Sequence, residues 1–457
     1  MTKRKVFNAV GCSIYAGLFT VGVKAAGFRV LAHLEQNAYG ADTAKLNHPE
    51  LEMYTGGPTS WPESFKQPVD FIFCNPPCAV WSPVGSAFFG KLAWRDDPRL
   101  QHAYDALQLI ERYKPTVWAW ESVPRALTQG RSMLAEMLAF GKERGYAGTV
   151  LHINAMRLGV PQDRPRVFVV MHKVAFEPEP CDYDKVLTVR DVWKKLPKHG
   201  REVEATSDSS LKWLPHVAPG QQPRQQFDAT FGHDMPLNKH GKVAGRPSLA
   251  DRRLSFDKPG NPMFAKLWHP DQPRRITLME SLRLCQLPED WQFGPSTKSV
   301  TARKELLQRA VMPGVGRWLA EAVMAALRAG KPAAIDQPAM VYDLRQRDHD
   351  VYGFDTGPVP VSSQRNARLP PWEGRLVRPP REPKPRLPPS VDAVAKAKRV
   401  CEGTTGSGAE IRRLLVIGKM NDAEIVEHVL KTFDGRKTSK ADVAWNRGML
   451  RKAGVLK

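Results

Sequence analysis

The sequence has no run of 18 apolar residues, so it predicts no membrane-spanning helix. Its N-terminus also lacks the longer apolar stretch and the small-residue cleavage site of a signal peptide. The few cysteines, at positions 12, 74, 78, 181, 285 and 401, form no CxxC pair and no Cys/His zinc spacing. We therefore expect a protein of the bacterial or phage-infected cytoplasm, with no disulfide, no membrane contact and no metal site.

Acidic residues are scarce relative to basic ones. Asp and Glu number 47 against 68 Lys and Arg, which gives a formal net charge of +21 over 457 residues. Such an excess favours a polyanionic partner, because each phosphate contact releases counterions. We expect double-stranded DNA, bound by a monomer; the alternative is a basic tail that only aids solubility.

The first 172 residues alternate strand-like and helix-like segments. Apolar runs at 6–10, 30–34, 69–74, 116–120 and 167–171 predict strands, and 96–113 and 133–144 have helical spacing. Strands separated by helices predict a parallel, doubly wound α/β sheet. Ligands of such sheets bind at the carboxyl ends of the strands. The segment 1–172 is therefore the expected catalytic domain.

The remaining chain predicts four further segments. Residues 173–272, rich in Pro, Gly, His and basic side chains, predict an irregular insert, and 273–332 return to helical patterning. Residues 333–404 predict a basic, Pro-rich linker, because 365–399 alone hold ten Lys or Arg and eight prolines. Residues 405–457 predict a small α-helical, helix-turn-helix-like module for DNA, or a charged hairpin for protein contacts.

A possible nucleophile follows the strand at 69–74. Cys78 stands directly after Pro76 and Pro77, on a rigid turn at the carboxyl end of that strand. A thiolate presented in this way can attack a substrate covalently if nearby groups lower its pKa. Glu121, after the strand at 116–120, would converge on the same edge of the sheet and could hold or deliver a proton.

These residues resemble motifs of the DNA cytosine-C5 methyltransferase family. The nucleophile motif of that family is Pro-Pro-Cys with a serine four residues later, its acid motif is Glu-Asn-Val, and a third motif is Gln-x-Arg-x-Arg. The matching residues are Pro76, Pro77, Cys78 and Ser82, then Glu121-Ser122-Val123, then Gln162, Arg164 and Arg166. The resemblance extends from about residue 6 to 330, interrupted by the insert. It implies a Rossmann-like, S-adenosylmethionine-dependent core, with 173–272 as the target-recognition region.

The resemblance also implies roles for these residues. Cys78 would attack C6 of a cytosine flipped out of the DNA, and Glu121 would assist protonation at N3. Arg166 would hold the cytosine O2, and Arg164 would orient the cysteine and a phosphate. Pro77, Ser82 and Gln162 would line the substrate site, and Pro76 the cofactor site.

The cofactor motif is less regular. The family has an aromatic-x-Gly-x-Gly loop after the first strand, whereas this chain has Gly11, Ser13, Tyr15 and Gly17 at stretched spacing. Tyr15 would substitute for the missing aromatic residue. Glu35, after the second strand, matches the acidic residue that binds the cofactor ribose; the alternative is a solvated helix cap.

The last motif departs most from the family. Where Gly-Asn-x-Val is usual, this chain has Gln308-Arg309-Ala310-Val311, with Arg309 and Val311 at the expected cofactor positions. Arg309 either points to solvent or pairs with an extra anionic group on the cofactor. A guanidinium is the natural partner of a carboxylate. Carboxy-S-adenosyl-L-methionine carries one on its transferable carbon, so the sequence predicts transfer of either a methyl or a carboxymethyl group.

Three other functions stay open. One is a catalytically inactive DNA-binding protein, because the cofactor motifs are altered. Another is an amino (N4 or N6) methyltransferase, because Asn75-Pro76-Pro77 resembles the motif of those enzymes. The third is a transfer-RNA enzyme of the same fold. A phage or mobile element that modifies its own DNA against host restriction is the expected setting.

Overall fold

The protein was studied as a computed structural model that describes residues 5–81, 98–178, 186–194, 196, 214–231, 247, 251–345 and 350–353, with isolated residues between 411 and 447. The chain divides into two compact units, Met1–Leu376 and Val377–Lys457. Most of the expected linker and of the expected module at 405–457 lies outside the described residues. Their functions and the four expected boundaries between the five segments stay predictions.

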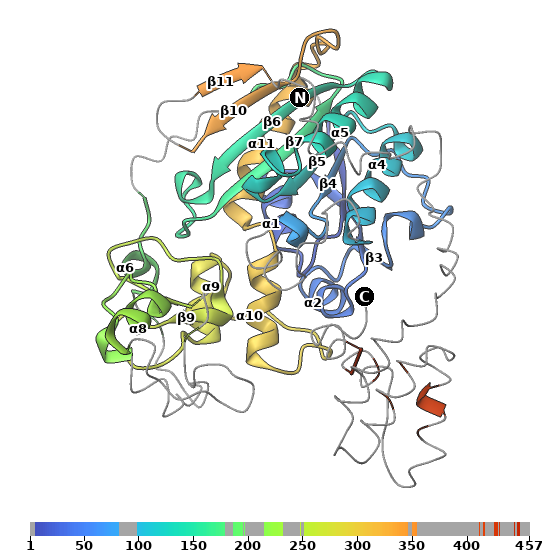
Figure 1. Ribbon diagram of the computed structural model, residues 1–457. Coiled ribbons are helices and arrows are strands. Elements are labelled where there is room, and N and C mark those ends of the chain that lie inside the picture. Colours follow the sequence, from blue (N-terminus) through green and yellow to red (C-terminus); the bar gives the residue numbers. More distant parts are fainter. Residues whose placement is uncertain are drawn as a thin grey trace, which may run out of the picture. The chain divides into compact units, whose positions relative to one another are not determined.

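One mixed sheet forms the centre of the first unit (Figure 1). In the described residues it has nine strands in the order β11-β10-β6-β7-β5-β4-β1-β2-β3. Their bounds are β1 Asn8–Cys12, β2 Arg29–Glu35, β3 Glu52–Thr55, β4 Phe71–Cys74, β5 Val117–Ser122, β6 Ala147–Asn154, β7 Pro165–His172, β10 Met340–Leu344 and β11 Asp350–Gly353. The order confirms the α/β methyltransferase-type core, with helices on both faces.

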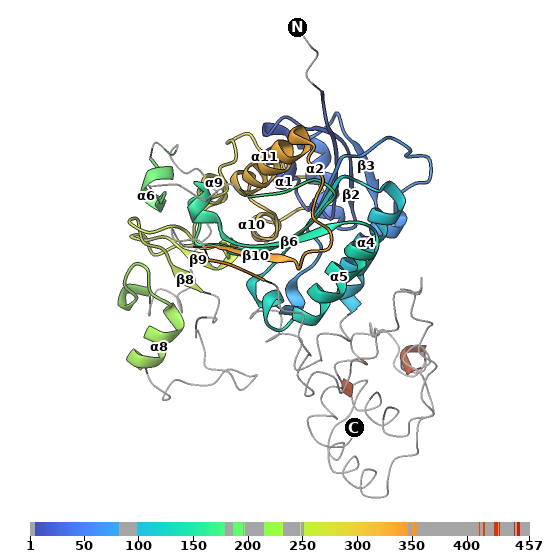
Figure 2. The ribbon, with the colours of Figure 1, turned by 90° about the horizontal axis from the view of Figure 1, so that it is seen from above.

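Helices cover the two faces of the sheet as separate layers (Figure 2). Successive strand residues point to opposite faces, so Phe71 and Phe73 join one apolar cluster while Ile72 and Cys74 join the other. The first cluster includes α1 (Leu18–Ala25), α10 (Val300–Arg309) and α11 (Pro313–Ala329). The second includes α4 (Gln101–Tyr113) and α5 (Arg131–Glu143). A further helix, α2 (Ala38–Asn47), follows β2.

The direction of β7 differs from the all-parallel sheet that the strand pattern predicts. It runs antiparallel to both of its neighbours, β5 and β6. The strands β1, β2, β4 and β5 are parallel to one another. The amino end of β7 therefore lies at the same edge of the sheet as the carboxyl ends of β4 and β5. This reversal brings Arg166, the second residue of β7, to the edge where Glu121 lies.

The described part of the insert holds short elements only. They are α6 Val189–Val192, η7 Leu214–His216, α8 Pro223–Phe231, β8 Arg252–Arg253, η8 Phe264–Lys266 and β9 Leu267–Trp268. The helix α9 (Leu278–Leu284) then leads back to α10 and α11. Among described residues, the stretch Val300–Ala329 is long and apolar enough to cross a membrane, but 72% of its most apolar 18-residue window is buried inside the protein. Its α11 part packs closely on α1, as a core helix does.

Part of the expected linker belongs to the sheet. The strand β10 pairs in parallel with β6, and β11 pairs antiparallel with β10. The interpretation of all of 333–404 as linker is therefore wrong for the strand residues 340–344 and 350–353. Val341 and Leu344 are apolar residues buried against the edge of the sheet. The sequence does not predict this burial, because the segment as a whole is basic and Pro-rich.

Candidate active site

Cys78 is held at the end of a short, anchored loop that leaves β4. The Asn75 amide donates to the carbonyl of Cys12 at the end of β1 (3.1 Å), and the Trp81 amide donates to the carbonyl of Cys78 (3.2 Å). Trp81 is fully buried, with its ring edge-on to Trp120 (6.1 Å between centroids). The loop is thus fixed at both ends, while Cys78 itself stays half-buried. Ser82, the expected substrate contact, lies outside the described residues.

Glu121 lies beside this loop as the penultimate residue of β5. Its carboxylate is 1% exposed; it accepts from the side-chain amide of Asn75, and Arg166 Nε lies 2.7 Å from its Oε1. Burial raises the pKa of Glu121, and the charges of Arg166 and Arg164 oppose that rise. A carboxyl group in this setting keeps its proton to a higher pH than usual, as a general acid requires.

The thiol of Cys78 shares this electrostatic environment. Burial raises its pKa to about 11, the negative charge of Glu121 adds to the rise, and Arg166 and Arg164 lower it. The structure therefore brings together Cys78, Glu121, Arg164 and Arg166, as the sequence predicts. It also shows that the thiol is protonated at neutral pH in the free protein.

Arg164 also has a structural role. Its guanidinium is 2% exposed and donates through Nη1 to the carbonyl of Gln308 (2.9 Å) and through Nη2 to that of Ala310 (2.8 Å). Burial, with the nearby charge of Arg166, lowers its pKa to about 9. These bonds use one N–H of each terminal nitrogen, and the expected contact with a DNA phosphate stays a prediction. Arg164 thus joins β7 to the end of α10.

Two other expected site residues have structural contacts. Gln162 is fully buried and donates through Nε2 to the carbonyl of Leu284 (2.7 Å), so it joins the segment before β7 to the end of α9. Its expected place in the substrate site stays a prediction. Gly11 lies inside β1 and not in the cofactor loop. A Cβ at Gly11 would lie 2.8 Å from the ring of Phe73, so its hydrogen side chain serves packing between strands.

The loop after β1 has an unusual backbone. Ser13 (φ 54°) and Tyr15 (φ 48°) are left-handed, and so is Gly17 (φ 82°), which precedes α1. The amide of Ser13 donates to the carbonyl of Leu34 (2.7 Å). Non-glycine residues in this region cost about 1 kcal/mol or more each, and such strain concentrates at ligand sites. The expected cofactor residues Ser13, Tyr15 and Gly17 thus form one tight turn at the carboxyl end of β1.

Glu35, at the carboxyl end of β2, supports this turn. Its Oε2 accepts from the Tyr15 amide (2.6 Å) and its Oε1 from the Asn37 amide (2.7 Å). Burial raises the pKa of Glu35 to about 7, although these backbone bonds oppose the rise. Each oxygen keeps a second lone pair, so the carboxylate can still accept from a ligand.

The remaining expected cofactor residues differ in exposure. Pro76 is buried and Pro77 half-buried beside Cys78. Val311 is 3% exposed and packs in the apolar cluster with α11, so it supports the wall of the site and does not present a free surface. Arg309, the last residue of α10, is exposed.

The comparison with known families decides the identity. The model of the C-5 cytosine-specific DNA methylase family matches residues 12–325. The chain belongs to the C-5 cytosine-specific DNA methylase family. Among curated relatives of this methylase, the Type II methyltransferase M1.HphI of Haemophilus parahaemolyticus is 26% identical over 326 residues, covering 68% of this chain and 84% of the relative. M.MthTI of Methanothermobacter thermautotrophicus is 31% identical over 256 residues, covering 52% of this chain and 73% of the relative.

Solved structures support the fold of the methylase. A prophage-encoded protein of Escherichia coli, described as a DNA modification methyltransferase, aligns with a TM-score of 0.51 at 18% identity. The methyltransferase EhMeth of Entamoeba histolytica also aligns with a TM-score of 0.51, at 16% identity. The alignments cover 70% and 71% of this chain and 99% of each neighbour. At this identity they show the shared fold alone.

The structure adds a residue of the methylase that the sequence analysis missed. His48 follows α2, and its Nε2 donates to the carbonyl of Gly17 (3.0 Å) while Lys24 Nζ donates to its Nδ1 (2.9 Å). Burial, followed by the charge of Lys24, lowers the pKa of His48 to about 4, so the ring is neutral. His48 therefore holds the cofactor loop. A lone histidine after a helix carries no signal of this in the sequence.

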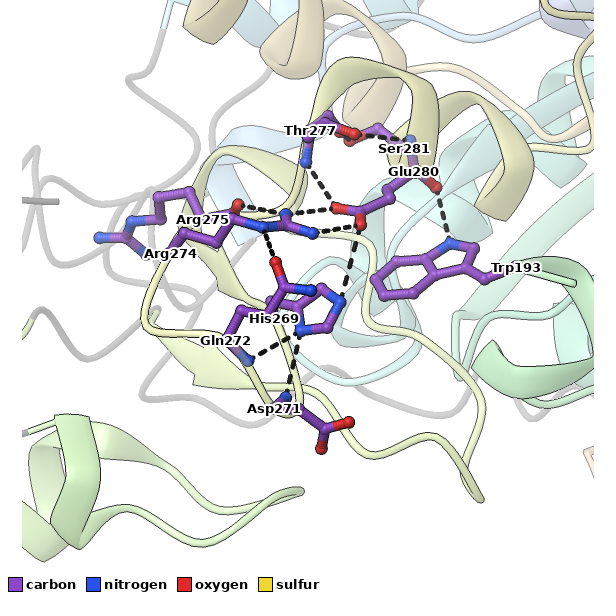
Figure 3. Close-up of polar contacts among 9 residues, drawn as sticks. All are labelled: Trp193, His269, Asp271, Gln272, Arg274, Arg275, Thr277, Glu280 and Ser281. Atoms are coloured by element: carbon purple, nitrogen blue, oxygen red, sulfur yellow. Dashed lines mark hydrogen bonds and ion pairs between the residues drawn. The ribbon is translucent and has the colours of Figure 1, made fainter. Parts of the chain in front are cut away.

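A second missed cluster joins the insert to α9 (Figure 3). The buried Glu280 carboxylate accepts two bonds from Arg274 (2.8 and 2.9 Å) and one from the amide of Thr277 (2.7 Å). The indole of Trp193 donates to the carbonyl of Glu280 (3.1 Å) and stacks on the ring of His269. The pattern Thr-x-x-Glu before an apolar run is a capping box, so the sequence did contain a signal for this helix start.

Within the described residues, no group of three or more His, Cys, Asp or Glu side chains is placed to hold a metal ion.

Proposed function

We propose that this methylase transfers a one-carbon-derived group to C5 of a cytosine in double-stranded DNA through a covalent bond between Cys78 and C6. The observation that carries the proposal is the convergence of Cys78, Glu121 and Arg166 at one edge of the sheet, with a 2.7 Å ion pair between the last two. A target base inside a duplex would reach these residues only after it is flipped out of the stack.

The residues divide the chemistry between them. The Cys78 thiol first loses its proton to water, and the thiolate sulfur then forms a bond to C6. The electron pair of the C5–C6 double bond moves towards C5 while N3 takes a proton from Glu121. After C5 accepts the new carbon, a base removes the C5 proton and the C6–S bond breaks. The thiolate leaves, the ring regains its double bond, and the N3 proton returns to Glu121. Arg166 would hold O2 and keep Glu121 oriented.

The residues around the β1 turn fit S-adenosyl-L-methionine. Glu35 presents a buried carboxylate at the end of β2, the position from which such folds bind a ribose hydroxyl. The turn at Ser13, Tyr15 and Gly17 lies at the neighbouring strand end. The bond from the Asn75 amide to the Cys12 carbonyl joins it to the loop that carries Pro76. When bound there, the cofactor would supply an electrophilic carbon attached to sulfur.

Trapping on DNA that contains 5-fluorocytosine tests the proposal. With cofactor present, C5 accepts the new carbon but the fluorine at C5 cannot then leave as a proton does, so the wild-type protein should form an adduct with the DNA that survives denaturation. Cys78→Ala should form none, whereas Cys285→Ala, which removes a buried thiol far along the chain, should keep the adduct. A wild-type protein that forms no adduct but still modifies the N4 or N6 amino group would establish the amino-methyltransferase alternative. Duplex DNA that stays unmodified, with transfer RNA modified instead, would establish the RNA enzyme.

A second candidate is transfer of a carboxymethyl group from carboxy-S-adenosyl-L-methionine. The observation in its favour is Arg309, an exposed guanidinium that has no ion-pair partner among the described residues and lies between two carbonyls held by Arg164. Mass spectrometry of nucleosides from treated DNA distinguishes the products. Efficient formation of 5-methylcytosine with ordinary cofactor, and no reaction with the carboxylated one, would exclude the carboxymethyl candidate. A Cys78→Ala protein with unchanged biological effect would instead support an inactive DNA-binding protein.

A further inference from the structure

Tyr15 occupies a strained position that glycine would adopt without cost. Its φ of 48° is left-handed, and its backbone is fixed by a 2.6 Å bond to Glu35 and by close contact with Gly40. A Cβ at Gly40 would lie 2.9 Å from the Tyr15 carbonyl oxygen. A bulky side chain retained at such a position indicates that the side chain itself is used.

The fold places Tyr15 beside the nucleophile. The strands β1 and β4 are adjacent and parallel, with Cys12 and Cys74 as register partners. Tyr15 follows Cys12 by three residues and Cys78 follows Cys74 by four, so both leave the same edge of the sheet. The bond from the Asn75 amide to the Cys12 carbonyl ties the two loops together.

The surroundings of the Tyr15 hydroxyl agree with this placement. Burial raises its pKa most, the charges of Cys78 and Glu35 raise it further, and that of Arg309 lowers it. Arg309 lies at the same edge of the sheet, because the Arg164 guanidinium just before β7 donates to the carbonyls of residues 308 and 310 (2.9 and 2.8 Å). In the part of the chain that the structure describes, the Tyr15 hydroxyl has no hydrogen-bond partner, and the Arg309 guanidinium has none either. The Tyr15 hydroxyl on the cofactor turn and the Arg309 guanidinium at the end of α10 are thus two donors that bind no described residue.

We propose that the Tyr15 hydroxyl and the Arg309 guanidinium together bind a carboxylate on the carbon that is transferred, which makes Tyr15 a specificity-determining residue. This inference rests on the proposed DNA cytosine-C5 transfer and on its carboxymethyl form. The hydroxyl donates one hydrogen bond to the carboxylate and the guanidinium supplies the opposite charge. Plain S-adenosyl-L-methionine has no acceptor there and would gain neither interaction.

Calorimetric binding of the two cofactors, without DNA, tests the inference separately from catalysis. The wild-type protein should bind carboxy-S-adenosyl-L-methionine at least about tenfold more tightly than S-adenosyl-L-methionine. Tyr15→Phe keeps the ring and should lose about tenfold in affinity for the carboxylated cofactor alone. Arg309→Asn should show the same selective loss. Tyr39→Phe, an exposed tyrosine on α2, is the matched control and should change neither affinity.

Each result has a distinct meaning. Equal wild-type affinity for the two cofactors, or an equal loss of both in Tyr15→Phe, would overturn the inference even if the 5-fluorocytosine adduct forms. A missing adduct would instead overturn the proposed transfer, whatever the binding ratio. An unfolding midpoint of Tyr15→Phe equal to that of the wild type shows that the loss comes from the hydroxyl and not from misfolding.

Discussion

The guanidinium of Arg164 holds the main chain on both sides of Arg309, through bonds of 2.9 and 2.8 Å to the carbonyls of residues 308 and 310. This links the catalytic end of β7 directly to the end of α10, 145 positions later in the chain. The position of the Arg309 side chain therefore depends on a residue that also acts electrostatically on Cys78 and Glu121.

Arg164→Lys should destabilise the protein. A lysine keeps the charge but cannot donate to both buried carbonyls in a fixed fork, and an unsatisfied buried carbonyl costs about 1–3 kcal/mol. Urea unfolding should show a loss in that range. The control Arg317→Lys lies on the exposed face of α11 and should change stability by less than about 0.5 kcal/mol. An unchanged unfolding midpoint in Arg164→Lys would show that the bonds from Arg164 to the end of α10 do not stabilise the fold.

Glu121→Gln should slow catalysis far more than it weakens cofactor binding. Glutamine keeps the size of the side chain but cannot deliver a proton to N3, so kcat should fall by about 10²–10⁴-fold. Single-turnover kinetics on duplex DNA measures this, and calorimetry should show cofactor affinity within about twofold of the wild type. The exposed Glu111→Gln serves as the control. Near-normal turnover in Glu121→Gln would show that Glu121 does not donate the proton to N3.

The same Glu121→Gln change should make Cys78 more reactive in the free protein. The pKa of Cys78 is raised to about 11 by burial and by the charge of Glu121, so its thiolate fraction is small at neutral pH and grows about tenfold per pH unit. Alkylation of Cys78 by iodoacetamide, followed by peptide mass spectrometry, should rise accordingly between pH 7 and 9. At any one pH in this range the variant should react faster. Slower alkylation in the variant would show that Glu121 does not oppose the thiolate.

Cofactor affinity should increase as the pH rises through about 7. The pKa of Glu35 is raised to about 7 by burial, and a ribose hydroxyl donates best to the ionised carboxylate, so the dissociation constant of S-adenosylhomocysteine should fall about tenfold from pH 6 to pH 8. Glu35→Gln should remove this pH dependence. The free energy of unfolding should change in the opposite direction to the cofactor affinity. Because the pKa of Glu35 is higher in the folded protein than in the unfolded chain, its contribution to stability is fully present below about pH 4.5 and is lost as the pH rises through 7. A wild-type affinity independent of pH would argue against a ribose contact.

Gly17→Ala should weaken both folding and cofactor binding. The new Cβ would lie 2.8 Å from the ring of His48 in a backbone with φ of 82°, so it would break the contact that holds the turn. Gly27→Ala is a matched control, since its φ is 93° but no atom lies within 4 Å of the new Cβ. It should show the backbone strain alone, about 1–2 kcal/mol, with normal cofactor affinity. If Gly17→Ala and Gly27→Ala changed stability and cofactor affinity equally, the contact of His48 with the turn would not be needed to hold it.

The motifs could be found from the sequence because each stands next to an apolar run. Pro76-Pro77-Cys78 follows one strand, Glu121 ends another, and Arg166 begins a third, so local pattern was enough to name them. The strand at 52–55 was missed because it is only partly buried and its sequence shows little periodicity. The strand at 147–154 was missed because polar residues such as Thr149 and His152 interrupt its apolar residues, although most of the strand is buried. The buried roles of Gln162 and Arg164 were also missed, because their partners lie more than 100 residues away.

The sequence by itself determined the catalytic family and the chemical types available, since a thiol, a carboxyl group and two guanidinium groups are properties of the residues alone. Only the tertiary structure decided which of these side chains lie close to one another. The reversal of β7 brought Arg166 to Glu121, and the return of α10 brought Arg309 beside Arg164, because strand direction and long-range packing depend on contacts between segments that no local pattern records.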